Sequence, residues 1–120
     1  MARVTARTDR PNRSLERHSD ASAANTALTL STLSGQLRRL LFVTVKYSAA
    51  PTQTGVTVTL NSGAGAAYDT LLATGSANAQ NTVYIPDEEI LLMGDDVIDV
   101  LAPAGGVGIT AAIAIYTEPL

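Results

Sequence analysis

The amino-acid sequence predicts an all-β domain, an antiparallel β-sandwich or jelly roll of seven or eight strands, with an extended N-terminal arm. Three observations lead to this prediction. Apolar and polar residues alternate from residue 26 onward, turn-forming residues separate the alternating stretches, and residues 1–25 show no such period. We therefore expect an arm at residues 1–25 and a sandwich domain at residues 26–120.

The predicted strands are short stretches in which apolar side chains recur at every second position, many of them β-branched. In the stretch 37–47, for example, aliphatic residues fall on one face and Phe42, Thr44 and Lys46 fall on the other. The stretch 66–73 fits either a strand or one helical turn. The Ala-rich stretch near the end favours a strand because isoleucines alternate through it. The predicted strands span residues 26–33, 37–47, 56–60, 82–85, 90–93, 97–101 and 109–116.

The core must consist of aliphatic side chains, because the chain has one Phe, four Tyr and no Trp. We expect the inward-facing positions of the alternating strands to form it, so that an aspartate at Val58 or Ile113 would bury a charge without a partner. The predicted core residues are Leu28, Leu30, Leu41, Val43, Val45, Val56, Val58, Leu60, Val83, Ile85, Ile98, Val100, Ile113 and Ile115.

Charge is divided unequally along the chain. Residues 1–46 hold all eight basic residues and three acids, for a net charge of +5, whereas residues 47–120 hold eight acids and no Lys or Arg. Such a division indicates a basic arm attached to an acidic body. The arm is too polar to offset its ordering entropy by burial, so we expect a neighbouring subunit to hold it. The expected partner-binding residues of the arm are Arg3, Arg7, Arg10, Arg13 and Arg17.

The arginine spacing also allows an alternative, a helix with one basic face that binds a nucleic-acid backbone. Pro11 lies within this run and would interrupt such a helix. The arm also has no aromatic residue to stack on bases. The sequence therefore favours an arm that is solvated or docks on acidic protein surfaces, over nucleic-acid binding.

Acidic residues gather near the end of the chain, at Asp87–Glu89 and at Asp95, Asp96 and Asp99. Their spacing matches no calcium-binding loop, and Asp95 after Gly94 is explained as a turn residue. The two Gly-rich stretches, 63–65 and 105–108, contain no Lys and fit hairpin loops better than a phosphate-binding loop. We therefore expect no metal and no cofactor.

Catalysis is not expected either. The only histidine, His18, lies in the predicted arm, so no base is placed to activate a Ser or Thr nucleophile. Cysteine is absent, which excludes disulfides and thiolate metal sites. No apolar run approaches the roughly 20 residues of a membrane-spanning helix, and residues 1–14 lack the apolar region of a signal peptide.

The stretch from Leu40 to Leu120 resembles the small β-sandwich virion proteins of tailed bacteriophages. The segment IPDEEILLMGDDVIDVLAPAGGVGITAAIAIY at residues 85–116 carries this resemblance, together with the polar arm. Within it, residues 92–100 (LMGDDVIDV) look like the strand, Gly-Asp and strand step of jelly rolls.

The resemblance implies a capsid decoration (cement) protein, which stabilises a phage head by bridging capsid subunits and has no catalytic residues. Its implied partners are other copies of itself, as in a trimer, and a major capsid or other virion protein, in a particle assembled in the host cytoplasm. Two alternatives remain open at this point. One is a head–tail connector, tail or fibre component, and the other is a carbohydrate-binding β-sandwich module.

Overall fold

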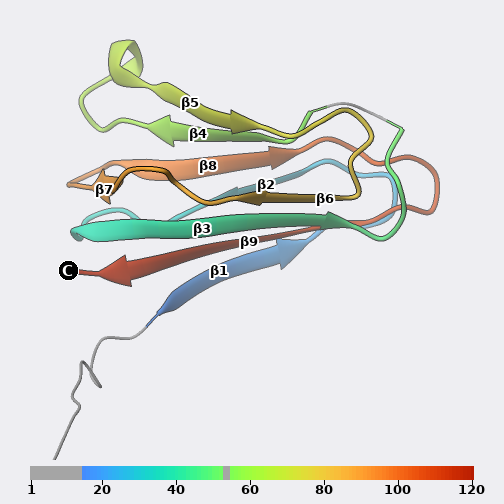
Figure 1. Ribbon diagram of the computed structural model, residues 1–120, viewed down its shortest axis with the longest axis horizontal. Coiled ribbons are helices and arrows are strands. Elements are labelled where there is room, and N and C mark those ends of the chain that lie inside the picture. The colour runs from blue at the N-terminus through green and yellow to red at the C-terminus, as the bar shows by residue number, and fades with distance from the viewer. Residues whose placement is uncertain (1–14, 53–54) are drawn as a thin grey trace, which may run out of the picture.

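The computed structural model describes residues 15–52 and 55–120, and these form two antiparallel sheets that face each other (Figure 1). The prediction of an all-β sandwich is confirmed, and the one helical element in the described residues is the short 3-10 turn η1. The elements are β1 (Glu16–Ala21), β2 (Leu28–Ser31), β3 (Arg38–Tyr47), β4 (Thr57–Asn61), η1 (Ala66–Tyr68), β5 (Thr70–Thr74), β6 (Asn81–Tyr84), β7 (Leu91–Leu92), β8 (Val97–Ala102) and β9 (Ala111–Pro119).

Strands that are far apart in the sequence are neighbours in the sheets. The five-stranded sheet has the order β1-β9-β3-β6, with β7 paired to the beginning of β3, and the four-stranded sheet has the order β2-β8-β4-β5. One long hairpin whose two halves run antiparallel would give the strand pairs that are observed, β1–β9, β2–β8, β3–β6 and β4–β5. The first and last strands of the described chain therefore lie side by side (Figure 1).

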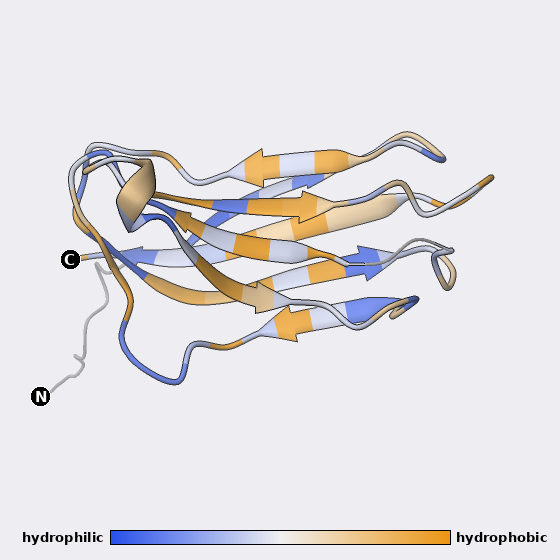
Figure 2. Cartoon of the chain, turned by 90° about the horizontal axis from the view of Figure 1, so that it is seen from above, coloured by the Kyte–Doolittle hydropathy of each residue, from blue (hydrophilic) through white to orange (hydrophobic). Residues whose placement is uncertain are grey.

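The core lies between the two sheets and is almost entirely aliphatic. Alternate residues of most strands are apolar, as the bands of Figure 2 show, and many of the inward ones are buried. Ile98, Val100 and Ile115 have no exposed surface. Leu30 and Leu60 are partly buried and pack against this cluster. The buried apolar residues are Leu28, Leu40, Val43, Val45, Tyr47, Val56, Val58, Leu92, Ile98, Val100, Ala102, Ala111, Ile113 and Ile115.

The prediction that Val83 and Ile85 belong to the core is wrong. Their side chains are 60% and 67% exposed, whereas Tyr84 packs against the core from the position opposite Val43. Both faces of this strand carry residues that suit a sheet, so alternation alone fits either phase. The pairing of β6 with β3 decides the phase, and it turns Val83 outward.

The prediction that Leu41 belongs to the core is also wrong, because β3 contains a β-bulge. Leu40 lies opposite Thr117 and Phe42 lies opposite Tyr116, so Leu41 is an extra residue without its own partner on β9. A bulge reverses the alternation beyond it. Leu40 is therefore buried at 3% exposure while Leu41 is only half-buried, and the predicted phase holds from Val43 onward.

The prediction that residues 1–25 lie outside the sandwich is wrong for its second half. Strand β1 pairs with β9 along its whole length, from Glu16 opposite Thr117 to Ala21 opposite Ala112. The backbone N–H of Asn25 continues this attachment by donating to the Ile109 carbonyl at 2.8 Å. The sandwich therefore begins at Glu16. Residues 1–14, the remainder of the predicted arm, lie outside the described residues.

An ion pair fastens β1 to the start of β3. Arg38 is 4% exposed, and its Nε donates to Glu16 Oε1 at 2.7 Å. The Thr117 hydroxyl donates to the same oxygen at 2.9 Å, and the Arg38 guanidinium also donates to the Leu33 carbonyl at 3.2 Å. Burial raises the pKa of Glu16, but the hydrogen bonds from Arg38 and Thr117 and the Arg38 charge outweigh it, so the pKa falls below 4.5.

Candidate functional site

The outer face of the five-stranded sheet is the candidate site, because it combines a stacked pair of aromatic rings, small side chains and two cations. The strand register places outward-facing residues of β1, β9 and β3 in three parallel rows. Phe42 and Thr44 face outward because Val43 and Val45 face the core. From one end to the other, the rows are Arg17–Tyr116–Phe42, Ser19–Ala114–Thr44 and Ala21–Ala112–Lys46.

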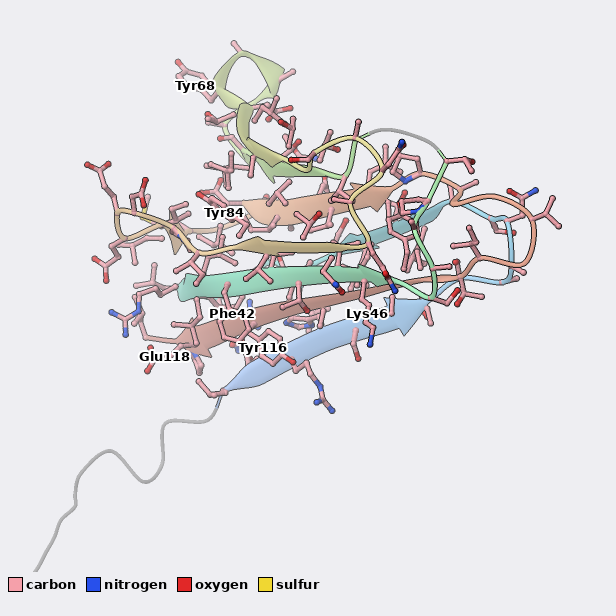
Figure 3. All side chains as sticks on the ribbon, turned by 45° about the vertical axis from the view of Figure 1, so that its right-hand side comes forward. Phe42, Lys46, Tyr68, Tyr84, Tyr116 and Glu118 are labelled. Atoms are coloured by element: carbon pink, nitrogen blue, oxygen red, sulfur yellow. The ribbon has the colours of Figure 1, made fainter. Side chains whose placement is uncertain are left out.

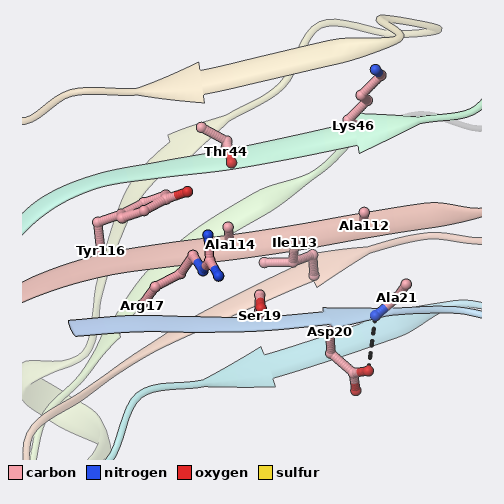
Figure 4. Close-up of a pocket in the computed structure, with 10 residues that line it drawn as sticks. All are labelled: Arg17, Ser19, Asp20, Ala21, Thr44, Lys46, Ala112, Ile113, Ala114 and Tyr116. Atoms are coloured by element: carbon pink, nitrogen blue, oxygen red, sulfur yellow. Dashed lines mark hydrogen bonds between the residues drawn. The ribbon is translucent and has the colours of Figure 1, made fainter. Parts of the chain in front are cut away.

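A depression of about 420 Å³ lies on this face (Figure 4). Its lining comes from β1, β9 and β3, and the second and third rows contribute mostly small side chains. We call this depression the trough and define it by Ser19, Ala21, Thr44, Ala112 and Ala114. It is hollow because alanine and serine side chains end close to the sheet, whereas the aromatic residues of the first row rise above it.

The ring of Tyr116 borders the trough and stacks on the ring of Phe42. Phe42 and Tyr116 lie directly opposite each other on β3 and β9, and their rings stack with centroids 4.2 Å apart and planes at 20° (Figure 3). Such a cross-strand pair stabilises the sheet by about 0.5–1.5 kcal/mol beyond the area that it buries. The stack also holds both rings in place, so that the trough has a rigid apolar side.

The charges on this face are positive. Arg17 and Lys46 are both exposed and line the trough from opposite corners of the rows (Figure 4). None of the nine residues in the three rows is acidic. Asp20 belongs to the rim, but its side chain leaves β1 on the other side, and its Oδ1 accepts the backbone N–H of Ala21 at 2.8 Å.

The apolar surface extends from the trough onto β6. Val83 lies opposite Thr44, and it and Ile85, which follows β6, are largely exposed. The outer face of the four-stranded sheet is different, because Thr29, Thr57 and Thr59 lie along it and Asp99 accepts hydrogen bonds from Ser31 and from Asn61, the latter at 2.9 Å. The exposed Leu71 and Leu101 lie on this face as well, so both outer faces carry apolar side chains, and it is the two cations that distinguish the outer face of the five-stranded sheet.

The predicted partner-binding arginines are placed only in part. Arg17 lies on β1 at the corner of the trough, so it belongs to the sheet and not to an arm. Arg3, Arg7, Arg10 and Arg13 lie outside the described residues, and their role stays a prediction.

The acidic residues near the end of the chain do not converge on one point. Asp96 closes a turn by accepting the Met93 N–H at 3.2 Å and the Gly63 N–H at 2.8 Å, while Asp99 lies on the outer face of β8. Within residues 15–52 and 55–120, no group of three or more His, Asp or Glu side chains could hold a metal ion. No helix in the same residues is long and apolar enough to cross a membrane.

His18 lies on the inner face of β1, opposite Ile115. Its Nε2 atom is buried and has no hydrogen-bond partner among the described residues. The sequence predicts that His18 lies in the arm, away from any pocket, whereas the structure places it against the sandwich. It faces away from the trough and brings no base to that surface.

The sequence predicts the face of β3 that lines the trough, but not the residues that β1 and β9 contribute. The alternation in β3 assigned Phe42, Thr44 and Lys46 to one face, and the structure shows that this face is the outer one. The pairing of Tyr116 and Ala114 with these residues was not predicted, because strands β3 and β9 are separated by more than sixty residues of sequence. Comparisons of the chain with protein families, with characterised proteins and with solved structures give no match.

Proposed function

We propose that this chain is a non-enzymatic structural subunit of a virus particle, a capsid decoration protein with a jelly-roll fold. One observation carries the proposal, the strand order β1-β9-β3-β6 facing β2-β8-β4-β5. A long hairpin wound into two Greek keys gives a double-sheet jelly roll, a fold that viral capsid proteins use repeatedly. The pairing of β1 with β9 and of β4 with β5 agrees with such winding.

The distribution of charge supports a role in assembly. Four arginines precede β1, which is an edge strand of the five-stranded sheet, and Arg17 and Lys46 add positive charge to its outer face. The loops Asp87–Glu89 and Met93–Asp96 carry acids that a basic segment of another copy, or of a shell protein, can pair with. Each exposed pair contributes only about 0–1 kcal/mol, so attachment depends on many copies binding together.

Two alternatives share the sandwich fold. A head–tail connector, tail or fibre component would have the same body but a different place in the particle. A carbohydrate-binding module uses aromatic rings as platforms for sugars. Here the Phe42 and Tyr116 rings stack on each other, so each has one face already covered, which favours a structural role.

The proposal is tested on purified particles from the source of this sequence. Quantitative mass spectrometry should find the chain in many copies per particle, in a fixed ratio to the major shell protein. Electron cryomicroscopy should place it on the outer shell. A single ring of copies at the neck or tail would support the connector alternative, and absence from the particle would overturn the virion assignment.

Removal of residues 1–14 should weaken attachment of the chain to its particle and leave folding of the sandwich unchanged. If residues 1–25 were all arm, as the sequence predicts, residues 1–20 could be deleted without affecting the body, but that deletion would remove most of β1 and the Glu16–Arg38 pair. We expect the chain without residues 1–14 to melt within a few degrees of the full-length protein, and to bind its particle much more weakly. Raised salt should weaken attachment of the intact protein as well, because exposed charges are screened.

The matched control is full-length protein in which Arg3, Arg7, Arg10 and Arg13 are all replaced by Lys. This variant keeps the charge and should retain most of its attachment. If the truncated chain attaches as strongly as the full-length chain, residues 1–14 are not the fastener, and the interface lies on the sandwich.

A further inference from the structure

We infer that the trough is a docking site for a second copy of this chain, and that its occupant is the acidic turn at the end of the sandwich, Met93–Asp96. We call this turn, which connects β7 to β8, the tip. The inference goes beyond the virion assignment, because it concerns contacts that the isolated protein makes with itself.

The trough requires an occupant with an apolar side chain and a carboxylate. Its lining is apolar or small, from Ala112, Ala114 and the ring of Tyr116. The charged side chains that project from this face, Arg17 and Lys46, are both cations, because the side chain of Asp20 on the rim points away from it. An apolar side chain that enters the trough would be desolvated on the alanines, and a nearby carboxylate would pair with a cation. The exposed apolar surface of Val83 and Ile85 beside the trough enlarges the area available for contact.

Charge argues against two other occupants. Residues 1–14 contain four arginines and one acid, so they would bring positive charge to Arg17 and Lys46. Two copies meeting face to face through their troughs would likewise place cations against cations, and like charges that meet at an interface are costly.

The tip provides the apolar side chain and the carboxylate that the trough requires. Met93 is 61% exposed, and Asp95, two residues later, is also exposed. Methionine is flexible and its sulfur contacts aromatic rings favourably, so it suits a hollow that Tyr116 borders. With Asp95 beside it, the tip presents one apolar side chain and one free carboxylate together.

The tip is also rigid, which lowers the entropy cost of docking. Asp96 fixes it by accepting the Met93 N–H and, from the β4–η1 connection, the Gly63 N–H. The tip rests directly on Gly63, because a Cβ atom there would lie only 2.8 Å from Asp95 Cβ. Asp96 is thus committed to the turn while Met93 and Asp95 remain available for a partner.

The tip lies at an end of the sandwich and the trough on its side, so a copy cannot fill its own trough (Figure 1). The contact is therefore head to tail, with different surfaces on the two copies. Contacts of this type produce a closed ring when the rotation closes and an open chain when it does not.

Sedimentation velocity of the full-length protein over a range of concentrations tests the inference. The wild-type chain should form species larger than a dimer as concentration rises. Ala112→Lys fills the trough without changing the sign of its charge, and Met93→Asp removes the apolar group of the tip. Each should weaken self-association at least about tenfold, equivalent to about 1.4 kcal/mol. The matched controls, Thr29→Lys on the outer face of the four-stranded sheet and Val107→Asp at the opposite end, should associate like wild type.

A mixture of the two variants gives the sharper result. The Ala112→Lys chain keeps an intact tip and the Met93→Asp chain keeps an intact trough, so together they should form a one-to-one dimer that cannot grow. All variants should melt close to wild type, since the changed residues are exposed. A wild-type chain that stays monomeric, variants that associate as strongly as their controls, or a mixture that forms no dimer would each overturn the inference. None of these outcomes bears on whether the chain is found in virus particles.

Discussion

Replacing Ile113 by aspartate should leave the protein unfolded under native conditions. Ile113 is 1% exposed, lies on β9 between β1 and β3, and faces the core between the sheets. A carboxylate there would have no partner, and burying it costs several kcal/mol out of a total stability of about 5–15 kcal/mol. Circular dichroism should show no cooperative thermal transition for this variant, in contrast to the wild-type chain.

The control for this prediction is Val83→Asp, which makes a comparable change on the outer face of the same sheet. Because Val83 is 60% exposed, the variant should lose less than about 1 kcal/mol of unfolding free energy. If both variants unfold, β6 has the opposite phase and Val83 faces the core, as the sequence pattern alone suggested.

Replacing Arg38 by methionine should cost about 3 kcal/mol of unfolding free energy. Methionine keeps most of the length of the side chain but removes the donors to Glu16 Oε1, to the Leu33 carbonyl and to Gln36. This loss of unfolding free energy is at the lower end of the range for buried ion pairs, because the Glu16 side chain is 27% exposed. Urea unfolding measures the loss, and Lys46→Met on the exposed face of the same strand should change stability by less than about 0.5 kcal/mol.

The same ion pair predicts how the difference between the two proteins depends on pH. In the wild-type chain the pKa of Glu16 is lowered, so its contribution to stability is complete above 4.5 and is lost as the pH falls through the folded-state pKa. In Arg38→Met, the Arg38 hydrogen bond and charge that lower the Glu16 pKa are gone. Burial then raises that pKa with only the Thr117 hydrogen bond as its main opponent. The stability difference between wild type and variant should therefore shrink as the pH falls from neutral into the acid range. A difference that stays constant with pH would show that Glu16 is not the partner through which Arg38 acts.

Those parts of the fold that follow from simple alternation were predictable from the sequence. Strand β4 alternates strictly, Asp99 separates two inward positions of β8, and Val58, Ile98 and Val100 are buried where the pattern placed them. The predicted inward face of β6 is wrong because Val83, Tyr84 and Ile85 are all suited to a sheet. Only the register with β3 distinguishes the two faces of this strand. Register depends on a partner strand that is distant in sequence, and a short pattern does not contain it.

Strand β1 could not be predicted because it has no apolar face. Its inward residues are Glu16, His18 and Asp20, and it is held by backbone pairing to β9 and by the Arg38 ion pair. A polar edge strand of this kind resembles a loop in composition, which is why the sequence predicts an arm as far as residue 25. The trough depends on the same pairing, so its β3 side was predictable and its β1 and β9 sides were not.

The position of β9 has a consequence for how the chain folds during synthesis. β9 lies between β1 and β3, yet it consists of residues 111–119, which leave the ribosome after all the other strands. Until they emerge, β1 has no strand to pair with, and β3 lacks its partner along most of its length. Until then the nascent chain has two unpaired strand edges. In this state, strands of neighbouring nascent chains can pair wrongly with them. The five-stranded sheet forms only after residues 111–119 have emerged, and because its central contacts are long-range, we expect it to form slowly compared with helical domains of this size.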